Sequence, residues 1–273
     1  MAGDNSYSPG QFTLDELRAA WPVPGAGDDK YSRGVVGLDT GSARYLGAAV
    51  LSTLGALRAG AGFIRFDGAP EARAAVMARC PSVTFGPGRV GAWVAGCGWD
   101  EGEMNVDRLA ARLADGWPCV IDAGALWVID DAAKMWGWAE LAENCLLTPH
   151  AGELARLLGV SRADVTASPA AYAEQAAARF GATVLLKGAI QYVAAPDGGV
   201  RQALPGPAWT AQAGSGDVLA GVAGTLLAAG LAAPQAGLAA ASLQALAAAE
   251  HPGPWSPDQL ADFFPATIAS FAA

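Results

Sequence analysis

The chain has 273 residues, 52% of them hydrophobic and 16% charged, and its 17 basic and 26 acidic residues give a formal net charge of −9. This apolar content argues against disorder, because the chain can bury enough surface to offset the entropy lost on ordering. The length suits one large α/β domain or two small ones. An acidic chain without a basic cluster lacks the electrostatic basis for binding nucleic acid or an anionic membrane, so we expect neither partner.

The predicted elements begin after an N-terminal arm. Residues 1–29 are rich in Gly, Pro and Asp, and the capping-box spacing of Thr13 and Glu16 indicates one short helix there. Residues 30–273 are expected to form a single domain, because neither a linker nor a repeat interrupts the pattern. Strands are expected over 35–38, 63–66, 91–95, 119–122, 145–148 and 183–187, with a hairpin formed by 190–194 and 200–203. Helices are expected over 48–59, 70–79, 104–115, 151–158, 170–180, 216–229, 235–249 and 256–263.

This alternation of strands and helices predicts a three-layer α/β/α fold around a central, mainly parallel sheet. The strands over 119–122 and 183–187 are apolar at consecutive positions, which is typical of strands covered on both faces. The uncharged run from Val218 to Ala233 is shorter than the roughly 20 residues of a membrane span and consists mostly of Ala and Gly. We interpret it as a buried core helix and expect no membrane contact.

The cysteines and histidines are too few and too widely spaced for a metal or redox motif. A core of this size does not need disulfide bonds, so we expect four free and mostly buried thiols. With two histidines, a multi-histidine metal site is excluded. The N-terminus lacks the basic and apolar regions of a signal peptide, and we expect a cytoplasmic protein. The cysteines are Cys80, Cys97, Cys119 and Cys145, and the histidines are His150 and His251.

The loop over 213–217, Ala-Gly-Ser-Gly-Asp, is the strongest chemical signal in the sequence. Glycines on both sides of Ser215, directly before a long apolar helix, allow backbone N–H groups to converge on an anion at the helix N-terminus. Asp217 then falls in the first turn of that helix. It is either a capping carboxylate or a base, beside a phosphate-binding loop, that takes a proton from a substrate hydroxyl.

Three further candidates follow predicted strands, at the edge of a parallel sheet where ligands gather. Lys187 ends an apolar strand and is either a solvated strand terminus or part of a nucleotide contact that continues to Gln191. His150 lies in a strand-to-helix turn, where it is either a structural cap or a substrate contact. Asp122 is either a helix cap or a functional buried carboxylate. A nucleophilic triad is excluded, because no second histidine and no exposed serine elbow accompany these residues.

Six segments in this order resemble one family, the ADP/ATP-dependent NAD(P)H-hydrate dehydratases, which have a ribokinase-like fold. The resemblance extends from about residue 13 to residue 263. The glycine-rich loop alone would be weak, because ribokinase-like kinases share it, whereas the ordered set is specific. The segments are DKYSRGVVGLDTGS at 29–42, GAAVLSTLGALRAGAG at 47–62, VIDAGAL at 120–126, LLTPHAGE at 146–153, VLLKGA at 184–189 and AGSGDVLAGVAGTLLAAG at 213–230.

The resemblance implies a repair enzyme for hydrated, inactive NADH or NADPH. ADP or ATP would phosphorylate the ring hydroxyl, and loss of phosphate would restore the dihydronicotinamide. Mg²⁺ is expected, held mostly by phosphate oxygens and water rather than by protein ligands. Asp217 would be the catalytic base, and the hydrated cofactor would contact Ala48, Gly98, His150 and Asp217. The nucleotide and its transferring phosphoryl group would contact Lys187, Gly188, Ala189, Ile190, Gln191, Gly214, Ser215 and Gly216.

The sequence departs from the family pattern at three places. Relatives usually carry Gly-Pro-Gly-Leu-Gly where this chain has Gly-Cys-Gly-Trp-Asp at 96–100, and Leu46 replaces a usual Pro. The usual His-Gly near the penultimate helix is absent, and Ser-Leu-Gln stands at 242–244. Two alternatives stay open: a ribokinase-like kinase of a vitamin-precursor alcohol, because phosphorylation alone needs the same loop, and a nucleotide-binding relative without catalysis, because of the departure at 97–99. We further expect a stand-alone dehydratase domain, without the epimerase domain of many relatives, and a homo-oligomer, since relatives often form tetramers.

Overall fold

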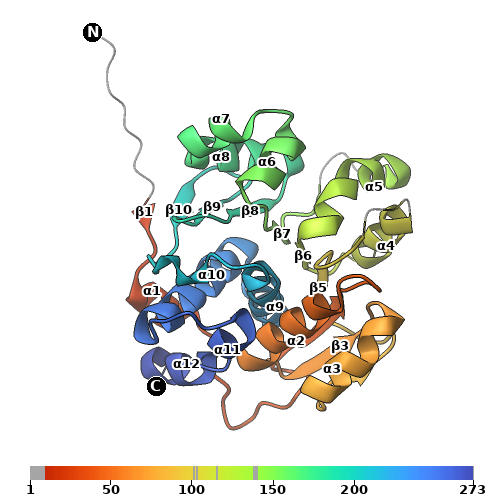
Figure 1. The fold of residues 1–273 in the computed structure, drawn as a ribbon, viewed down its shortest axis with the longest axis vertical. Coiled ribbons are helices and arrows are strands. Elements are labelled where there is room, and N and C mark those ends of the chain that lie inside the picture. The colour runs from red at the N-terminus through yellow and green to blue at the C-terminus, as the bar shows by residue number, and fades with distance from the viewer. Residues whose placement is uncertain (1–9, 101, 103, 115, 138–140, 273) are drawn as a thin grey trace.

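The computed structural model describes residues 10–100, 102, 104–114, 116–137 and 141–272. Within these residues, a ten-stranded sheet has the order β1-β10-β9-β8-β7-β6-β5-β2-β3-β4 (Figure 1). Neighbouring strands are parallel from β4 across to β8, while β9 is antiparallel to both β8 and β10. The strands are β1 (Gly10–Gln11), β2 (Val35–Asp39), β3 (Phe63–Phe66), β4 (Thr84–Phe85), β5 (Ala92–Ala95), β6 (Cys119–Ile121), β7 (Cys145–Leu147), β8 (Thr183–Leu186), β9 (Tyr192–Ala194) and β10 (Val200–Gln202).

Helices cover both faces of this sheet and bury a separate apolar core against each face. One core involves α1 to α3 and α9 to α12, and the other involves α4 to α8. The fold is therefore the expected α/β sandwich with a central, mainly parallel sheet. The helices are α1 (Leu14–Ala20), α2 (Leu46–Arg58), α3 (Arg73–Arg79), α4 (Met104–Leu113), α5 (Ile129–Trp136), α6 (Ala151–Leu158), α7 (Arg162–Ala167), α8 (Pro169–Phe180), α9 (Ser215–Ala228), α10 (Ala233–Glu250), α11 (Pro257–Ala261) and α12 (Phe264–Ala272).

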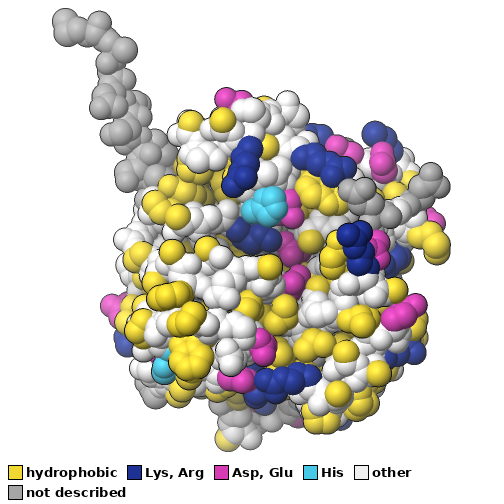
Figure 2. Space-filling model, in the orientation of Figure 1, with side chains coloured by type: hydrophobic (Ala, Val, Ile, Leu, Met, Phe, Trp, Pro, Cys, Tyr) yellow, Lys and Arg dark blue, Asp and Glu magenta, His cyan; other side chains and the backbone are white. Residues whose placement is uncertain are grey.

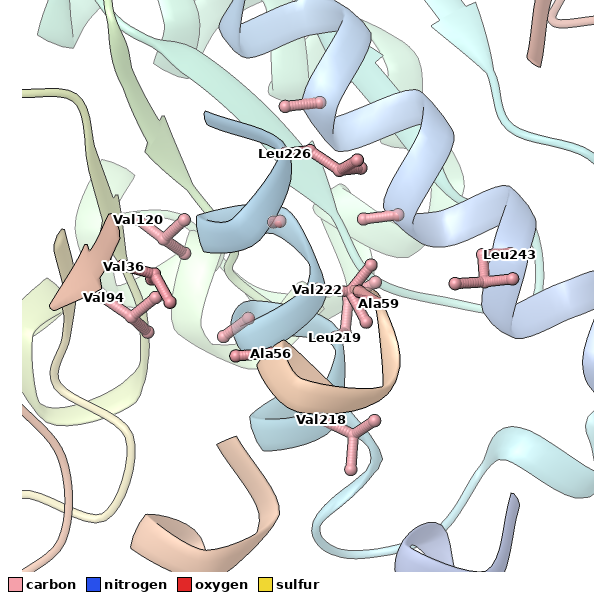
Figure 3. Packing of buried hydrophobic residues seen from close by; sticks show 14 of the residues in the cluster. Val36, Ala56, Ala59, Val94, Val120, Val218, Leu219, Val222, Leu226 and Leu243 are labelled. Carbon is pink, nitrogen blue, oxygen red and sulfur yellow. The ribbon is translucent and has the colours of Figure 1, made fainter. Parts of the chain in front are cut away.

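Helix α9 runs through one of these cores and holds the predicted anion loop at its N-terminus. Figure 3 shows its apolar side chains among valines of β2, β5 and β6 on one side and residues of α2 and α10 on the other. The contact with α2 is between backbones, since a Cβ added to Gly55 would lie 2.1 Å from the carbonyl oxygen of Val218. Small residues make this approach possible. The prediction of a buried core helix is confirmed, and the close packing fixes where the first turn of α9 lies.

Sequence periodicity located most elements but missed several short ones. It missed α5, α7, α12, β1 and β4. The short helix predicted over 256–263 is found as α11, but it is not the last one, because the chain starts α12 at Phe264. Pro265 falls in the first turn of α12, where its missing N–H costs nothing, and a new helix can begin.

Other expectations concern the arm, the thiols and the membrane. Thr13 and Glu16 form the expected capping box of α1, and β1 joins the sheet beside β10, while residues 1–9 lie outside the described part of the chain. All four cysteines are free and buried, as expected.

Among the described residues, no helix combines the length and apolar character that a membrane span requires. The domain boundary near residue 30 stays a prediction.

Candidate functional site

The candidate site lies at the carboxyl edge of the parallel strands, where β5, β6, β7 and β8 are neighbours. The residues that follow these strands are Cys97, Asp122, Thr148 and Lys187. An isolated parallel bridge between His150 and Lys187 joins the segments beyond β7 and β8. Figure 2 shows basic, acidic and histidine side chains meeting near the middle of the face viewed. Ligands of open α/β sheets bind at such an edge, so the residues found there are the candidates.

Lys187 and Asp122 form an ion pair at the centre of this edge. The Nζ of Lys187 lies 2.7 Å from Oδ1 of Asp122, and the Thr148 hydroxyl donates to the same oxygen at 2.8 Å. The side chains of Lys187 and Asp122 are 18% and 2% exposed. Burial alone would lower the pKa of Lys187, but the charges of Asp122 and Glu153 outweigh it and raise that pKa above its usual value. The capping role considered for Asp122 and the solvated-terminus interpretation of Lys187 are therefore both wrong.

Asp217 faces this ion pair from the first turn of α9. Its carboxylate, the Cys97 sulfur and the Asp122 carboxylate place one atom each within 4.8 Å of one another. Burial raises the pKa of Asp217 to about 7, with a further contribution from the charge of Asp122, while Lys187 and a hydrogen bond from Cys97 oppose the rise. The Asp217 side chain does not cap α9. A carboxylate with a pKa near neutrality can both accept and return a proton, which is the property of a general base.

The glycine-rich loop places backbone amides beside these side chains. Gly214 precedes α9 with a φ of +93°, a left-handed conformation that glycine adopts without strain. The N–H groups in the first turn of an α-helix have no acceptor within the helix and attract anions. A Cβ added to Gly216 would lie 3.0 Å from the Nζ of Lys187, so the loop and the lysine share one space. The amide side chain of Gln244 donates to the carbonyl oxygen of Ser215 at 3.0 Å and fixes the loop from α10.

His150 caps α6 and directs part of its ring to solvent. Its Nδ1 accepts hydrogen bonds from the backbone N–H groups of Gly152 and Glu153 at 3.0 and 3.1 Å, which confirms the structural-cap interpretation. The Glu153 carboxylate accepts in return from the His150 backbone N–H at 2.7 Å. Since Nδ1 is an acceptor here, Nε2 is the ring nitrogen that carries a proton. The His150 side chain is 60% exposed, so a ligand can approach its Nε2, which lies 3.5 Å from Oε1 of Glu153.

Glu153 brings a second buried carboxylate close to Lys187. Burial raises the pKa of Glu153, and Asp122 adds to the rise, while the positive charge of Lys187 opposes it. The residue is 8% exposed. One lysine thus balances a buried acidic group formed by Asp122, Glu153 and Asp217, which makes its ammonium the main counter-charge of the site.

Ala48 and Gly98 meet on the side of the site formed by α2 and the turn after β5. Gly98 has a φ of +67°, and a Cβ added there would lie 2.5 Å from the Cβ of Ala48 and 3.0 Å from that of Tyr45. Two of the four residues that the resemblance assigns to the hydrated cofactor are therefore in contact. The same helix approaches the glycine loop, since a Cβ on Gly214 would lie 2.6 Å from the Cδ1 of Leu51.

The remaining predicted nucleotide residues lie in the turn between β8 and β9. Gly188, Ala189 and Ile190 are exposed, and Gln191 is half-buried, with its carbonyl oxygen accepting from the N–H of Ala203 at 3.0 Å. The structure thus brings Lys187 into the side-chain cluster and leaves the next residues on the adjacent surface, where a nucleotide could reach them. Their contact with a nucleotide stays a prediction.

Sequence reasoning missed four residues that build the site. Cys97 was noted as a departure from the family pattern and not as a neighbour of two carboxylates. Thr148 and Glu153 lay inside a motif but were given no role in the charge cluster. Gln244 carried a signal that could have been used, because it and Gln235 are the two amides of an alanine-rich helix, and such a residue, when buried, needs a hydrogen-bond partner.

Mg²⁺ requires a set of hard oxygen donors. In the described part of the chain, the group that could surround an ion is Cys97, Asp122 and Asp217. This group does not fit Mg²⁺, because one donor is a thiol sulfur and Oδ1 of Asp122 already accepts hydrogen bonds from Lys187 and Thr148. The prediction that phosphate oxygens and water hold Mg²⁺ stays a prediction.

Solved structures define the class of the fold. An ADP/ATP-dependent NAD(P)H-hydrate dehydratase from Bacillus subtilis, co-crystallised with ATP and Mg²⁺, matches with a TM-score of 0.84 and 24% identity over 97% of this chain and 100% of that one. A ribokinase-like superfamily protein from Enterococcus faecalis matches with a TM-score of 0.85 and 22% identity over 99% of both chains. The molecule therefore has the ribokinase-like fold that the sequence predicted.

Sequence comparison then gives the family. The family model described as NAD(P)H-hydrate dehydratase matches residues 36–261. The chain is 42% identical over 225 residues to the bifunctional NAD(P)H-hydrate repair enzyme Nnr of Mycobacterium tuberculosis, covering 81% of this chain and 46% of that protein. It is 36% identical over 245 residues to the ADP-dependent (S)-NAD(P)H-hydrate dehydratase of Xanthomonas campestris, covering 77% of each. The chain thus spans about half the length of the mycobacterial relative, and it belongs to the NAD(P)H-hydrate dehydratase family.

Proposed function

We propose that the protein is a nucleotide-dependent dehydratase that converts (S)-NAD(P)H-hydrate to NAD(P)H. The observation that carries this proposal is the position of Asp217, which lies in the first turn of α9 and within 4.8 Å of Asp122 and Cys97 at the strand edge. A proton acceptor and a set of anion-binding amides are thereby in one place. That combination suits transfer of a phosphoryl group to a hydroxyl.

The first half-reaction is phosphorylation. Asp217 accepts the proton of the ring hydroxyl while that oxygen forms a bond to the terminal phosphorus of ADP or ATP, and the bond from that phosphorus to the leaving nucleotide breaks. The first-turn amides around Ser215 and Gly216 hold the transferring group, because they direct N–H groups at developing negative charge. Lys187, anchored on Asp122, supplies positive charge next to Gly216. Mg²⁺ carried by the phosphate oxygens of the nucleotide would supply further positive charge there.

The second half-reaction is elimination. The carbon–oxygen bond to phosphate breaks, phosphate leaves with the bonding electrons, and the neighbouring ring carbon gives a proton to the departing phosphate, which restores the ring double bond. Ala48 and Gly98 form the wall against which the ring would lie, and the exposed Nε2–H of His150 is available to donate to a polar group of the cofactor. The exposed turn over 188–191 would contact the nucleotide from the other side of Lys187.

The test is product analysis with chemically hydrated NADH or NADPH, Mg²⁺, and either ADP or ATP. The proposal predicts that reduced nicotinamide absorbance returns and that one inorganic phosphate is released for each cofactor repaired. A stable phosphorylated product would instead indicate a kinase. Nucleotide binding without turnover of either cofactor, measured by calorimetry alongside the assay, would indicate a relative without catalysis.

A further inference from the structure

Cys97 occupies an unusual place, fully buried in the turn after β5 and facing two carboxylates. Its Sγ lies 3.5 Å from Oδ2 of Asp122, and a carboxylate oxygen of Asp217 is within 4.8 Å of both. Backbone hydrogen bonds fix this turn: the Gly41 N–H donates to the Cys97 carbonyl oxygen at 2.7 Å, and the Trp99 N–H donates to that of Gly96 at 3.0 Å. The position of the thiol is therefore determined by the fold.

The two carboxylates differ in what else they can bind. Oδ1 of Asp122 accepts hydrogen bonds from Lys187 and Thr148. The Cys97 thiol donates to Oδ2 of Asp122 at 3.5 Å, and a carboxylate oxygen of Asp217 lies within 4.8 Å of the same sulfur, where the thiol lowers the pKa of Asp217. An ionised carboxylate only accepts hydrogen bonds, so the hydrogen of this thiol stabilises whichever carboxylate receives it. Burial, together with the charges of Asp122 and Asp217, raises the pKa of Cys97 well above its usual value, so the donor keeps its hydrogen at neutral pH.

We propose that Cys97 is a positioning residue for the base of the proposed reaction: its single thiol hydrogen is shared by Asp217 and Asp122 and keeps Asp217 ionised and ready to accept the substrate's proton. This inference rests on the proposed function only in naming Asp217 as the base. The groups that face Asp217 are Asp122 and Glu153, which disfavour its negative charge, and Lys187 and Cys97, which favour it. Lys187 and the thiol both contact Asp122, but the thiol hydrogen can rotate about the Cβ–Sγ bond between the two carboxylates, whereas Lys187 forms the 2.7 Å ion pair with Asp122.

The test is an NMR titration of aspartate carboxyl carbons in ¹³C-labelled protein, with the Asp217 signal identified by its loss in Asp217→Asn. In Cys97→Ala the midpoint of Asp217 should rise by roughly half a pH unit or more, because the donor is gone. In Cys97→Ser it should fall below the wild-type midpoint, because a hydroxyl donates more strongly than a thiol. The matched control is Cys119→Ala, which removes an equally buried thiol whose hydrogen-bond partner is the carbonyl oxygen of Val120.

Three results would overturn the inference: an unchanged midpoint in Cys97→Ala, an equal rise in Cys119→Ala, or a midpoint in Cys97→Ser at or above the wild-type value. Should Cys97→Ala not fold, the Cys97→Ser titration decides alone. The titration requires no turnover, so it distinguishes this inference from the proposed function. If the enzyme is active, the acidic limb of its kcat/KM profile should shift in the same direction as the midpoint in each variant.

Discussion

The Nζ of Lys187 lies 2.7 Å from Oδ1 of Asp122, and this buried ion pair joins the ends of two parallel strands that are not adjacent in the sheet. Lys187 follows β8 and Asp122 follows β6, with β7 between them. The Thr148 hydroxyl, from the segment after β7, donates to the same oxygen and completes the link. The pair therefore links the ends of these strands next to the glycine loop that precedes α9.

Breaking this pair from one side should be costly. Lys187→Met leaves the Asp122 carboxylate buried without its counter-charge, and we expect a loss of about 3–5 kcal/mol in the free energy of unfolding, measured with a chemical denaturant. The double variant Lys187→Met with Asp122→Asn should recover most of that loss, since no lone charge is left. Lys134→Met removes an exposed lysine 3.3 Å from Asp131 and should cost under about 0.5 kcal/mol. Equal losses in the single and double variants would show that the unpaired charge of Asp122 is not the cause of the loss.

The activity should follow the ionisation of Asp217. Burial raises the pKa of Asp217 to about 7, and a base acts only in its deprotonated form. We therefore expect kcat/KM to rise with pH through about 7 and to level off above it, where the carboxylate is ionised. The measurement is a pH profile of kcat/KM at fixed ionic strength. An acidic limb centred near pH 4, the ordinary range of an exposed aspartate, would contradict the burial described here.

Gly98→Ala should disturb the cofactor wall specifically. The new Cβ would lie 2.5 Å from that of Ala48, so α2 or the turn after β5 must shift, and kcat/KM for the hydrated cofactor should fall about 10-fold or more. Nucleotide affinity, measured by calorimetry, should change little. Gly159→Ala is the matched control, because Gly159 has nearly the same φ, +69° against +67°, but nothing within 4 Å of its added Cβ. If both variants lose activity equally, backbone strain and not the contact with Ala48 is responsible.

Two substitutions of His150 should distinguish its capping of α6 through Nδ1 from a ligand contact through Nε2. Asn is a good N-cap residue, so His150→Asn should retain stability, whereas His150→Ala should lose about 1 kcal/mol in the free energy of unfolding. Both variants lack Nε2–H and should raise the KM for the hydrated cofactor to a similar extent. Thermal or chemical unfolding together with steady-state kinetics checks both expectations. A normal KM in His150→Asn would limit His150 to capping α6.

The sequence predicted the architecture well because strand and helix periodicities are local signals. The apolar run after Val218 was correctly interpreted as a core helix, since its length and composition exclude other roles. Short elements were missed because they carry little periodicity of their own. The two residues of β1, for example, form a strand only through pairing with β10, a contact between segments about 190 residues apart in the chain.

The site shows the same division between local and distant signals. The glycine loop, Asp217 and His150 were found because the turn chemistry around each of them is visible in consecutive residues. The ion pair of Lys187 with Asp122 joins residues 65 positions apart, and the approach of Cys97 to Asp217 joins residues from different layers. No propensity or spacing rule encodes such contacts, because the order of the strands in the sheet creates them.

The role of Asp217 as the base is tested most directly by comparing Asp217→Asn with the wild type. Two experiments are made on the same preparations: nucleotide binding by calorimetry, and turnover of the hydrated cofactor. Asn keeps the shape of the side chain but cannot act as a base. We expect Asp217→Asn to bind ADP or ATP with near wild-type affinity and to turn over hydrated cofactor roughly 10²–10⁴-fold more slowly. Wild-type turnover in this variant would contradict the assignment of Asp217 as the base.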